Sequence, residues 1–141
     1  MSIYADSSVL VALYLADRRL VQAQRLRGRY GRAWLTPLHR AELAQAVAQQ
    51  LYMKRVSAAQ AQEVLANFQR DRQSAVWMEV SHPESAFDRS IQLVEQYGGR
   101  VPLATLDTLH VASALELGSE RFLTFDERQA KLARAVGLKV S

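Results

Sequence analysis

The sequence predicts an α/β fold: a three-layer α/β/α sandwich around a mostly parallel sheet of five strands. Five short apolar stretches, each suited to one strand, alternate with amphipathic helical patterns. Helices separate successive strands, which is the arrangement that a parallel sheet with helices on both faces requires. The 141 residues, 49% of them hydrophobic, fit a single domain over 1–141.

The N-terminal elements are predicted from strand and capping signals. Residues 2–5 (SIYA) form the first strand, a helix follows from Ser7 or Ser8 to about residue 16, and a second helix covers 18–29. The stretch AWLT forms the second strand. Its last residue, Thr36, caps a helix that has Pro37 at its first position and ends near residue 53.

The remaining elements are predicted in the same way, with glycines ending three of the helices. In chain order they are a helix over 57–71 opened by a Ser57–Gln60 capping box, a strand in 75–80, a helix from Pro83 to Gly98, an apolar helix within 101–118 closed by Gly118, a strand over 121–125, a helix over 126–137 closed by Gly137, and a last strand over 138–140.

The composition excludes several classes of protein. The chain has no Cys and three scattered His, which leaves no disulfide framework, zinc ribbon or thiol nucleophile. Any metal would therefore be held by oxygen. No apolar run approaches the length of a membrane span, and the N-terminus lacks the pattern of a signal peptide. We expect a soluble, cytoplasmic protein with no membrane partner.

Basic residues are concentrated in the first half of the chain. The formal net charge is +4, and residues 18–62 contain nine basic side chains but one acid. Such a half could face a polyanion, and we expect some of its arginines to hold an RNA backbone. The alternative is an ordinary solvated helix face. The candidates for RNA binding are Arg25, Arg27, Arg29 and Arg32.

Two carboxylates are predicted to lie at one edge of the sheet. Asp6 directly follows the first strand, and Asp126 directly follows the strand over 121–125. Ligands of open parallel sheets bind at the carboxyl ends of the strands, so both residues are site candidates. Helix capping is the alternative for each of them, because Asp is a favoured N-cap.

Two further acids belong with this pair. Asp107 lies in a strongly apolar helix, where an unpaired carboxylate is costly, although a place in the first turn with Thr105 as cap would also explain it. His110, three residues on, could complete a metal pair with Asp107, but packing at the rim is favoured because the other candidates are hard oxygens. Glu42 lies on a helix boundary between apolar and polar sides, which is also typical of a surface residue.

Taken together, the four acids predict a metal site. Converging carboxylates repel one another unless a divalent cation is bound, and oxygen-only ligands favour Mg²⁺ or Mn²⁺. Beside an arginine-rich face, such a site suits hydrolysis of phosphodiesters by a metal-activated water. The predicted metal ligands and catalytic residues are Asp6, Glu42, Asp107 and Asp126.

Four motifs in order along the chain resemble those of the PIN-domain family: YADSSVLVALYL, LHRAELAQAV, ATLDTLHVASALELG and FLTFDERQAKLARAVGLKV. The length resembles the stand-alone PIN toxins of prokaryotic VapBC toxin–antitoxin pairs. The resemblance assigns the four acids to the family's metal site, and Ser8 and Thr124 to its supporting hydroxyl positions.

The resemblance implies a single PIN-like nuclease domain that acts as a Mg²⁺- or Mn²⁺-dependent endoribonuclease, is usually a homodimer, and is silenced by a small antitoxin protein. Two other enzyme classes lack required residues. A haloacid-dehalogenase-type phosphatase needs an acid where Ser8 stands, and a receiver-like domain needs an acidic pair and a lysine that are not evident. The remaining alternative is a non-catalytic RNA-binding or protein-interaction domain that retains the fold.

Overall fold

The computed structural model describes residues 2–141, which form five strands and seven helices. In chain order these are β1 (Ile3–Ala5), α1 (Ser7–Leu15), α2 (Leu20–Tyr30), β2 (Trp34–Leu35), α3 (Pro37–Tyr52), α4 (Ala58–Gln73), β3 (Met78–Glu79), α5 (Ala86–Tyr97), α6 (Thr105–Glu116), β4 (Arg121–Leu123), α7 (Glu127–Ala135) and β5 (Lys139–Val140).

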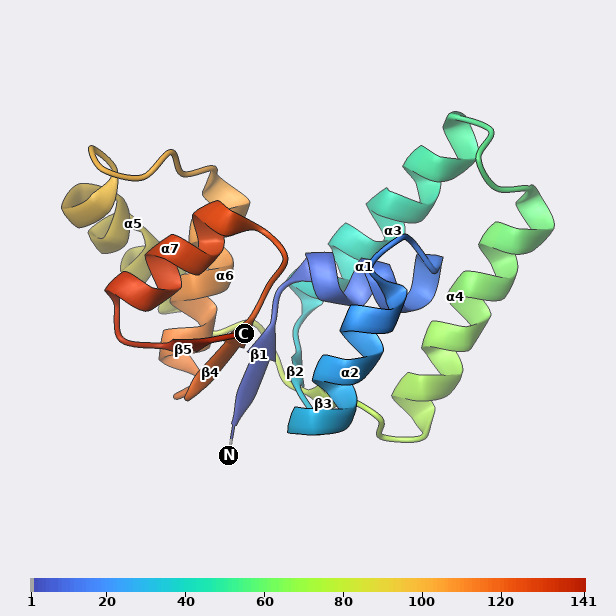
Figure 1. Cartoon of the computed structure of the whole chain (residues 1–141), viewed down its shortest axis with the longest axis horizontal. Helices are drawn as coiled ribbons and strands as arrows, with labels where there is room; N and C mark the ends of the chain where they lie inside the picture. The colour runs from blue at the N-terminus through green and yellow to red at the C-terminus, as the bar shows by residue number, and fades with distance from the viewer. Residues whose placement is uncertain (1) are drawn as a thin grey trace.

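The strands form the middle layer of an α/β/α sandwich, which confirms the predicted fold class. Helices α1–α4 lie on one side of the strands and α5–α7 on the other (Figure 1). Each side has its own apolar core, and β1 contributes to both because neighbouring side chains of a strand point to opposite faces. Ile3 and Ala5 belong to the core with α1–α4, whereas Tyr4 belongs to the core with α5–α7.

All strand pairs in residues 2–141 are parallel, as predicted, but the hydrogen bonds do not form one continuous five-stranded sheet. One ribbon has the order β1-β4-β5, and the other pairs β2 with β3. Between β1 and β2 the Ala5 carbonyl accepts a hydrogen bond from the ring of His39, at 2.7 Å. In a continuous sheet, this carbonyl would accept a hydrogen bond from a backbone N–H of the neighbouring strand. Here it accepts from a side chain instead.

His39 also caps the helix that carries it. The backbone N–H of Thr36 donates to His39 Nδ1 at 3.0 Å, so the imidazole occupies the place that Glu or Gln takes in a usual capping box. Since Nδ1 accepts and Nε2 donates to Ala5, the ring is neutral with its proton on Nε2. One buried side chain thus joins the start of α3 to the end of β1.

Most predicted helix boundaries are close to those observed. The Ser57–Gln60 capping box is confirmed, with both of its hydrogen bonds present. The start of α6 is different, because Ala104, in an extended conformation, is its N-cap and Thr105 is already helical. The start predicted at Pro83 was also early, because residues 84–85 form a turn ahead of α5. Within residues 2–141, every helix is too short or too polar to cross a membrane.

The neutral state of His39 predicts a pH-dependent stability. Burial lowers the pKa of His39 to about 3, whereas an unfolded chain has a histidine pKa of about 6.5. The unfolded state therefore binds a proton that the folded state excludes, and the free energy of unfolding falls as pH decreases from about 6.5 toward 3. The decrease is up to about 1.4 kcal/mol per pH unit.

Urea unfolding at pH 7 and pH 5 measures this contribution. His39→Gln keeps an N–H donor for Ala5 but cannot titrate, so its stability should depend less on pH than that of the wild type. His82→Gln, at a less buried histidine, is the matched control and should behave more like the wild type. Equal pH dependence in the wild type and His39→Gln would contradict the assignment.

Candidate active site

Asp6 lies at the carboxyl end of β1, where it is also the N-cap of α1. Its Oδ1 accepts hydrogen bonds from the Ser8 backbone N–H at 3.0 Å and from the Ser8 hydroxyl at 2.5 Å. Its Oδ2 accepts from the Thr124 hydroxyl, also at 2.5 Å. The cap therefore uses one carboxylate oxygen of Asp6, and Thr124, the residue after β4, donates to the other.

The charge of Asp6 has no side-chain counterion. The residue is fully buried, and burial raises the pKa of its carboxyl above the ordinary value, against the effect of the hydroxyl donors. No Lys or Arg of the described residues forms an ion pair with it. A buried carboxylate in this state is unfavourable for folding unless a cation approaches it.

Ser8 and Thr124 also tie the ends of β1 and β4 together. The Ser8 hydroxyl accepts from the Phe125 backbone N–H at 3.0 Å, and the Thr124 hydroxyl accepts from the Asp126 N–H at 2.9 Å. Each hydroxyl therefore donates to Asp6 and accepts from the turn that leads into α7. Asp6 and the segment carrying Asp126 are held in fixed relation by these two side chains.

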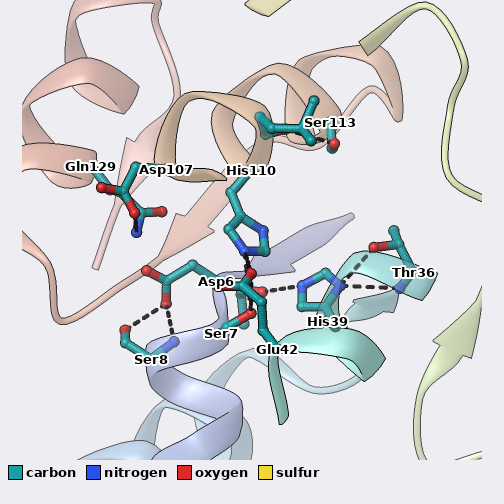
Figure 2. Close-up of polar contacts among 12 residues, drawn as sticks. Asp6, Ser7, Ser8, Thr36, His39, Glu42, Asp107, His110, Ser113 and Gln129 are labelled. Carbon is teal, nitrogen blue, oxygen red and sulfur yellow. Dashed lines mark hydrogen bonds and ion pairs between the residues drawn. The ribbon is translucent and has the colours of Figure 1, made fainter. Parts of the chain in front are cut away.

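Glu42 reaches the site from α3 and is bound through one oxygen. The Ser7 hydroxyl donates to Glu42 Oε1 at 2.8 Å, and His110 Nε2 forms a hydrogen bond with the same oxygen (Figure 2). Burial alone would raise the pKa of Glu42, but the bonds from His110 and Ser7 outweigh it and hold the pKa below its usual value. Glu42 is therefore an ionised carboxylate.

The predicted place of His110 at the rim was wrong, because its side chain is only 1% exposed. It reaches across from α6 to α3, between Glu42 and the hydroxyl of Tyr4, which is 2.7 Å from His110 Nδ1. Residues 108–114 of α6 are all buried, so the side chain of His110 lies in the core and not at the rim. One feature of the sequence indicated a place near the acids, because His110 shares a helix face with Asp107. Nothing in the sequence indicated that the side chains of Tyr4 and Ser7 contact His110.

Asp107 and Asp126 form a second group at the starts of α6 and α7. Asp126 caps α7, and Asp107 lies in the first turn of α6. The Arg128 guanidinium is 3.3 Å from Asp126 Oδ2 and 3.8 Å from Asp107 Oδ2. Gln129 Nε2 donates to Asp107 Oδ1 at 3.0 Å. Neither Arg128 nor Gln129 was among the predicted site residues.

The pKa values of the two acids of this group are shifted in opposite directions. Burial, followed by repulsion from Asp126, raises the pKa of Asp107. Burial would also raise the pKa of Asp126, but hydrogen bonds from Arg128 and the start of α7 lower it below the ordinary value. The carboxylates are thus close enough to influence one another, as expected for acids that share a site.

The donor set fits a hard divalent cation that keeps part of its water shell. Within residues 2–141 no three acidic or histidine side chains are arranged closely enough to enclose a metal ion. Mg²⁺, however, commonly binds through one or two carboxylates together with water and substrate phosphate. The uncompensated Asp6 and the buried amide oxygen of Gln129, which has no partner in the described residues, are the oxygens such an ion would satisfy.

Comparison with protein families agrees with this fold. The family model described as PIN domain matches residues 3–135. The chain belongs to the PIN domain family. No curated protein sequence matches the chain.

Solved structures share the PIN fold at low sequence identity. VapC20 of Mycobacterium tuberculosis, described as a sarcin-ricin loop cleaving toxin, is 19% identical with a TM-score of 0.70, over 97% of this chain and 96% of its own. VapBC2 of Rickettsia felis, bound to a promoter DNA fragment, is 14% identical with a TM-score of 0.69, over 100% and 98%. FitAcB of Neisseria gonorrhoeae is 16% identical with a TM-score of 0.67, over 98% and 95%.

The four arginines predicted to bind RNA lie away from the acids of this PIN domain. Three are in the second half of α2, which ends where β1 and β2 begin (Figure 1), and Arg32 precedes β2. Arg27 lies over the Trp77 ring at 5.5 Å, and Arg32 donates to the Trp77 carbonyl at 3.4 Å. Asp6 and Asp126 instead follow the carboxyl ends of β1 and β4, and RNA binding by the four arginines stays a prediction.

Two other arginines lie closer to the acids. Arg19 lies 5.4 Å from the ring centre of Phe125, the residue before Asp126. Arg128, 52% exposed, contacts Asp107 and Asp126 directly. A cavity of ≈ 420 Å³ opens beside Glu42, lined also by Leu38, Gln45, Gln49 and Leu106. The acidic edge of the PIN domain therefore has both cationic side chains and an adjoining groove.

The burial of Asp6 predicts that removing its charge will not weaken the fold. In Asp6→Asn the side-chain oxygen can still accept from Ser8, and Asn is as good an N-cap as Asp. Without a divalent cation, the variant should unfold at a free energy at least equal to that of the wild type, while losing cation-induced stabilisation. Thermal unfolding with and without Mg²⁺ checks this, with Asp17→Asn as the surface control; a loss of about 2 kcal/mol or more in Asp6→Asn would contradict it.

Proposed function

We propose that this PIN domain is a metal-dependent endoribonuclease, the toxin of a type II toxin–antitoxin pair. The observation that carries the proposal is the fully buried Asp6, which has hydroxyl donors on both oxygens and no side-chain counterion among the described residues. A buried carboxylate kept in this state is unfavourable for stability and is typical of a site that binds a cation.

The alternative is a non-catalytic RNA-binding or protein-interaction domain that has retained the PIN fold. Such a domain has no need for a buried charge, and exchange of Asp6 for an uncharged residue would relieve its desolvation. All four acids are present, and Glu42 is held ionised by Ser7 and His110. These features favour the endoribonuclease over the non-catalytic domain.

We assign the cation, Mg²⁺ or Mn²⁺, to Asp6, Glu42, Asp107 and Asp126. When bound, the cation would lower the pKa of the attacking water and neutralise negative charge at the phosphate. The chain's own residues prepare the site. Ser8 and Thr124 orient Asp6, His110 and Ser7 hold Glu42 by one oxygen, and Arg128 is exposed enough to exchange its carboxylate contacts for a phosphate of the RNA.

The buried histidines argue against a metal-free mechanism. Attack by the substrate's own 2′-hydroxyl would need an acid and a base within reach of the RNA. His39 and His110 are each only 1% exposed, and both are engaged inside the core. We therefore assign the attack to water, which leaves a 5′-phosphate and a 3′-hydroxyl.

Cleavage of an RNA with unpaired segments by the purified PIN domain tests this function. We expect cleavage with Mg²⁺ or Mn²⁺, none in excess chelator, and 5′-phosphate ends in the sequenced products. Asp107→Asn should reduce the rate at least a hundredfold, because it removes a ligand charge. The surface variant Asp88→Asn, in α5, is the matched control and should retain the wild-type rate.

Two results would overturn the mechanism. Products with 2′,3′-cyclic phosphates, or a rate that chelator leaves unchanged, would show attack by the 2′-hydroxyl. Specific RNA binding without cleavage under any divalent cation would instead favour the non-catalytic domain.

Arginines supply a separate prediction about RNA affinity. Phosphate contacts release counterions, so each lost contact reduces the slope of log affinity against log salt concentration. Arg19→Ala and Arg128→Ala, near the acids, should each reduce the slope by about 1. Arg25→Ala and Arg29→Ala, on the predicted arginine cluster of α2, provide the comparison. A reduced slope only in the α2 variants would place the RNA on that face.

We further propose a homodimer that uses α5. Its exposed apolar side chains Phe87, Ile91 and Val94 follow helical spacing, are 47–57% exposed, and are joined by Leu106 at 47%. Monomers rarely expose a contiguous apolar stripe of this kind. Sedimentation should show a dimer for the wild type and a monomer for Ile91→Glu, with unchanged helix content; a monomeric wild type would refute the assignment.

The antitoxin partner is proposed from the structural relatives. Their descriptions include VapBC of Salmonella typhimurium bound to DNA and a toxin–antitoxin complex of Klebsiella pneumoniae. A short reading frame immediately upstream, encoding a protein with a DNA-binding N-terminus, is the observation that would support such a partner.

A further inference from the structure

The side chain of Glu42 is hydrogen-bonded through only one of its two carboxylate oxygens. Within residues 2–141, its side-chain hydrogen bonds all end on Oε1, from the Ser7 hydroxyl and from His110 Nε2. The side chain is 27% exposed, so it lies at the border between the core and the groove beside it. One oxygen is therefore anchored in the protein and Oε2 remains for a ligand.

His110 is itself fixed on the opposite side of its ring. The hydroxyl of Tyr4 is 2.7 Å from Nδ1, and burial raises the pKa of Tyr4, which keeps it a neutral phenol. With the hydroxyl donating to Nδ1, the imidazole carries its proton on Nε2, the atom that contacts Glu42. Donation by the Tyr4 hydroxyl to Nδ1 is therefore compatible with donation by Nε2 to Glu42.

Tyr4 is rigid because aromatic rings pack on it. The Phe122 ring stacks at 5.6 Å with an interplanar angle of 5°, and the His39 ring lies at 4.9 Å. Tyr4 and His110 are nearly inaccessible to solvent. A core position would ordinarily be filled by apolar side chains, whereas here a chain of polar groups crosses the core and ends on a carboxylate at the site.

We propose that His110 is a positioning residue for Glu42, with Tyr4 as the group that sets its tautomer. His110 does not touch the substrate; it holds Oε1 so that Oε2 is presented to the cation. Hydrogen-bond partners behind metal ligands commonly change metal affinity tenfold to a hundredfold when removed. This inference rests on the proposed metal site, and its tests separate the two.

The first test needs no metal. Long-range ¹H–¹⁵N NMR spectra of ¹⁵N-histidine-labelled protein should show a proton on His110 Nε2, the atom that contacts Glu42. Tyr4→Phe, which removes only the hydroxyl, should disturb that signature while His82 keeps its wild-type signals. A ring protonated at Nδ1 in the wild type would overturn the proposal, because Nε2 could not donate to Glu42.

The second test measures binding of Mn²⁺ alone by calorimetry, at a pH where the wild type is folded. His110→Leu should bind at least tenfold more weakly, and His110→Gln, whose amide can donate from a similar place, should recover most of the loss. His82→Leu is the matched histidine control and should bind as the wild type does. Circular dichroism verifies that each variant is folded. If His110→Leu does not fold, Tyr4→Phe replaces it in this test and is expected to weaken Mn²⁺ binding severalfold.

A double-mutant cycle with Glu42→Gln tests whether His110 changes Mn²⁺ affinity through Glu42. If His110 acts through Glu42, then His110→Leu should cause no further loss in the Glu42→Gln background. Full additivity of the two losses, or wild-type Mn²⁺ affinity in folded His110→Leu or Tyr4→Phe, would overturn the positioning role. Absence of Mn²⁺ binding by the wild type would instead reject the proposed metal site, whatever the NMR spectra show.

Discussion

The burial of one negative charge, at Asp6, constrains the rest of the structure. The carboxylate occupies the end of the first strand, where the start of a helix and two hydroxyls surround it. Those hydroxyls in turn hold the turn that carries Asp126. The ends of β1 and β4 are therefore joined by hydrogen bonds that meet at the side chain of Asp6.

Two buried histidines extend this polar layer through the core. Their ring centres are 5.1 Å apart, and the Tyr4 ring packs against both. His39 joins β1 to the start of α3, while His110 joins α6 to a later turn of α3. Helix α3 is thus attached to the strands and to the opposite helical layer by imidazoles. A hydrophobic core alone would leave the orientation of Glu42 less defined.

The sequence predicted the fold and the positions of the acids because the relevant signals are local. Strand and helix periodicity placed Asp6 and Asp126 after strands, and capping chemistry predicted the starts of α3 and α4. The internal contacts depend on residues far apart in sequence. His110 and Glu42 are separated by 68 positions, so periodicity could place each on a helix but could not pair them. The hydrogen bond between the His39 side chain and the Ala5 carbonyl is likewise long-range, and no strand pattern reveals it.

The acids are divided evenly between the two halves of the chain. Asp6 and Glu42 lie in the segment that ends with β3, whereas Asp107 and Asp126 lie in the segment that begins with α5. The connection between them is a short stretch without helix or strand. A chain cut there would yield two fragments, each with half of the site, that must associate through β1 and β4 to restore it. The proposed nuclease activity would then report fragment complementation, since the parallel pairing of β1 with β4 joins the two segments that carry the acids.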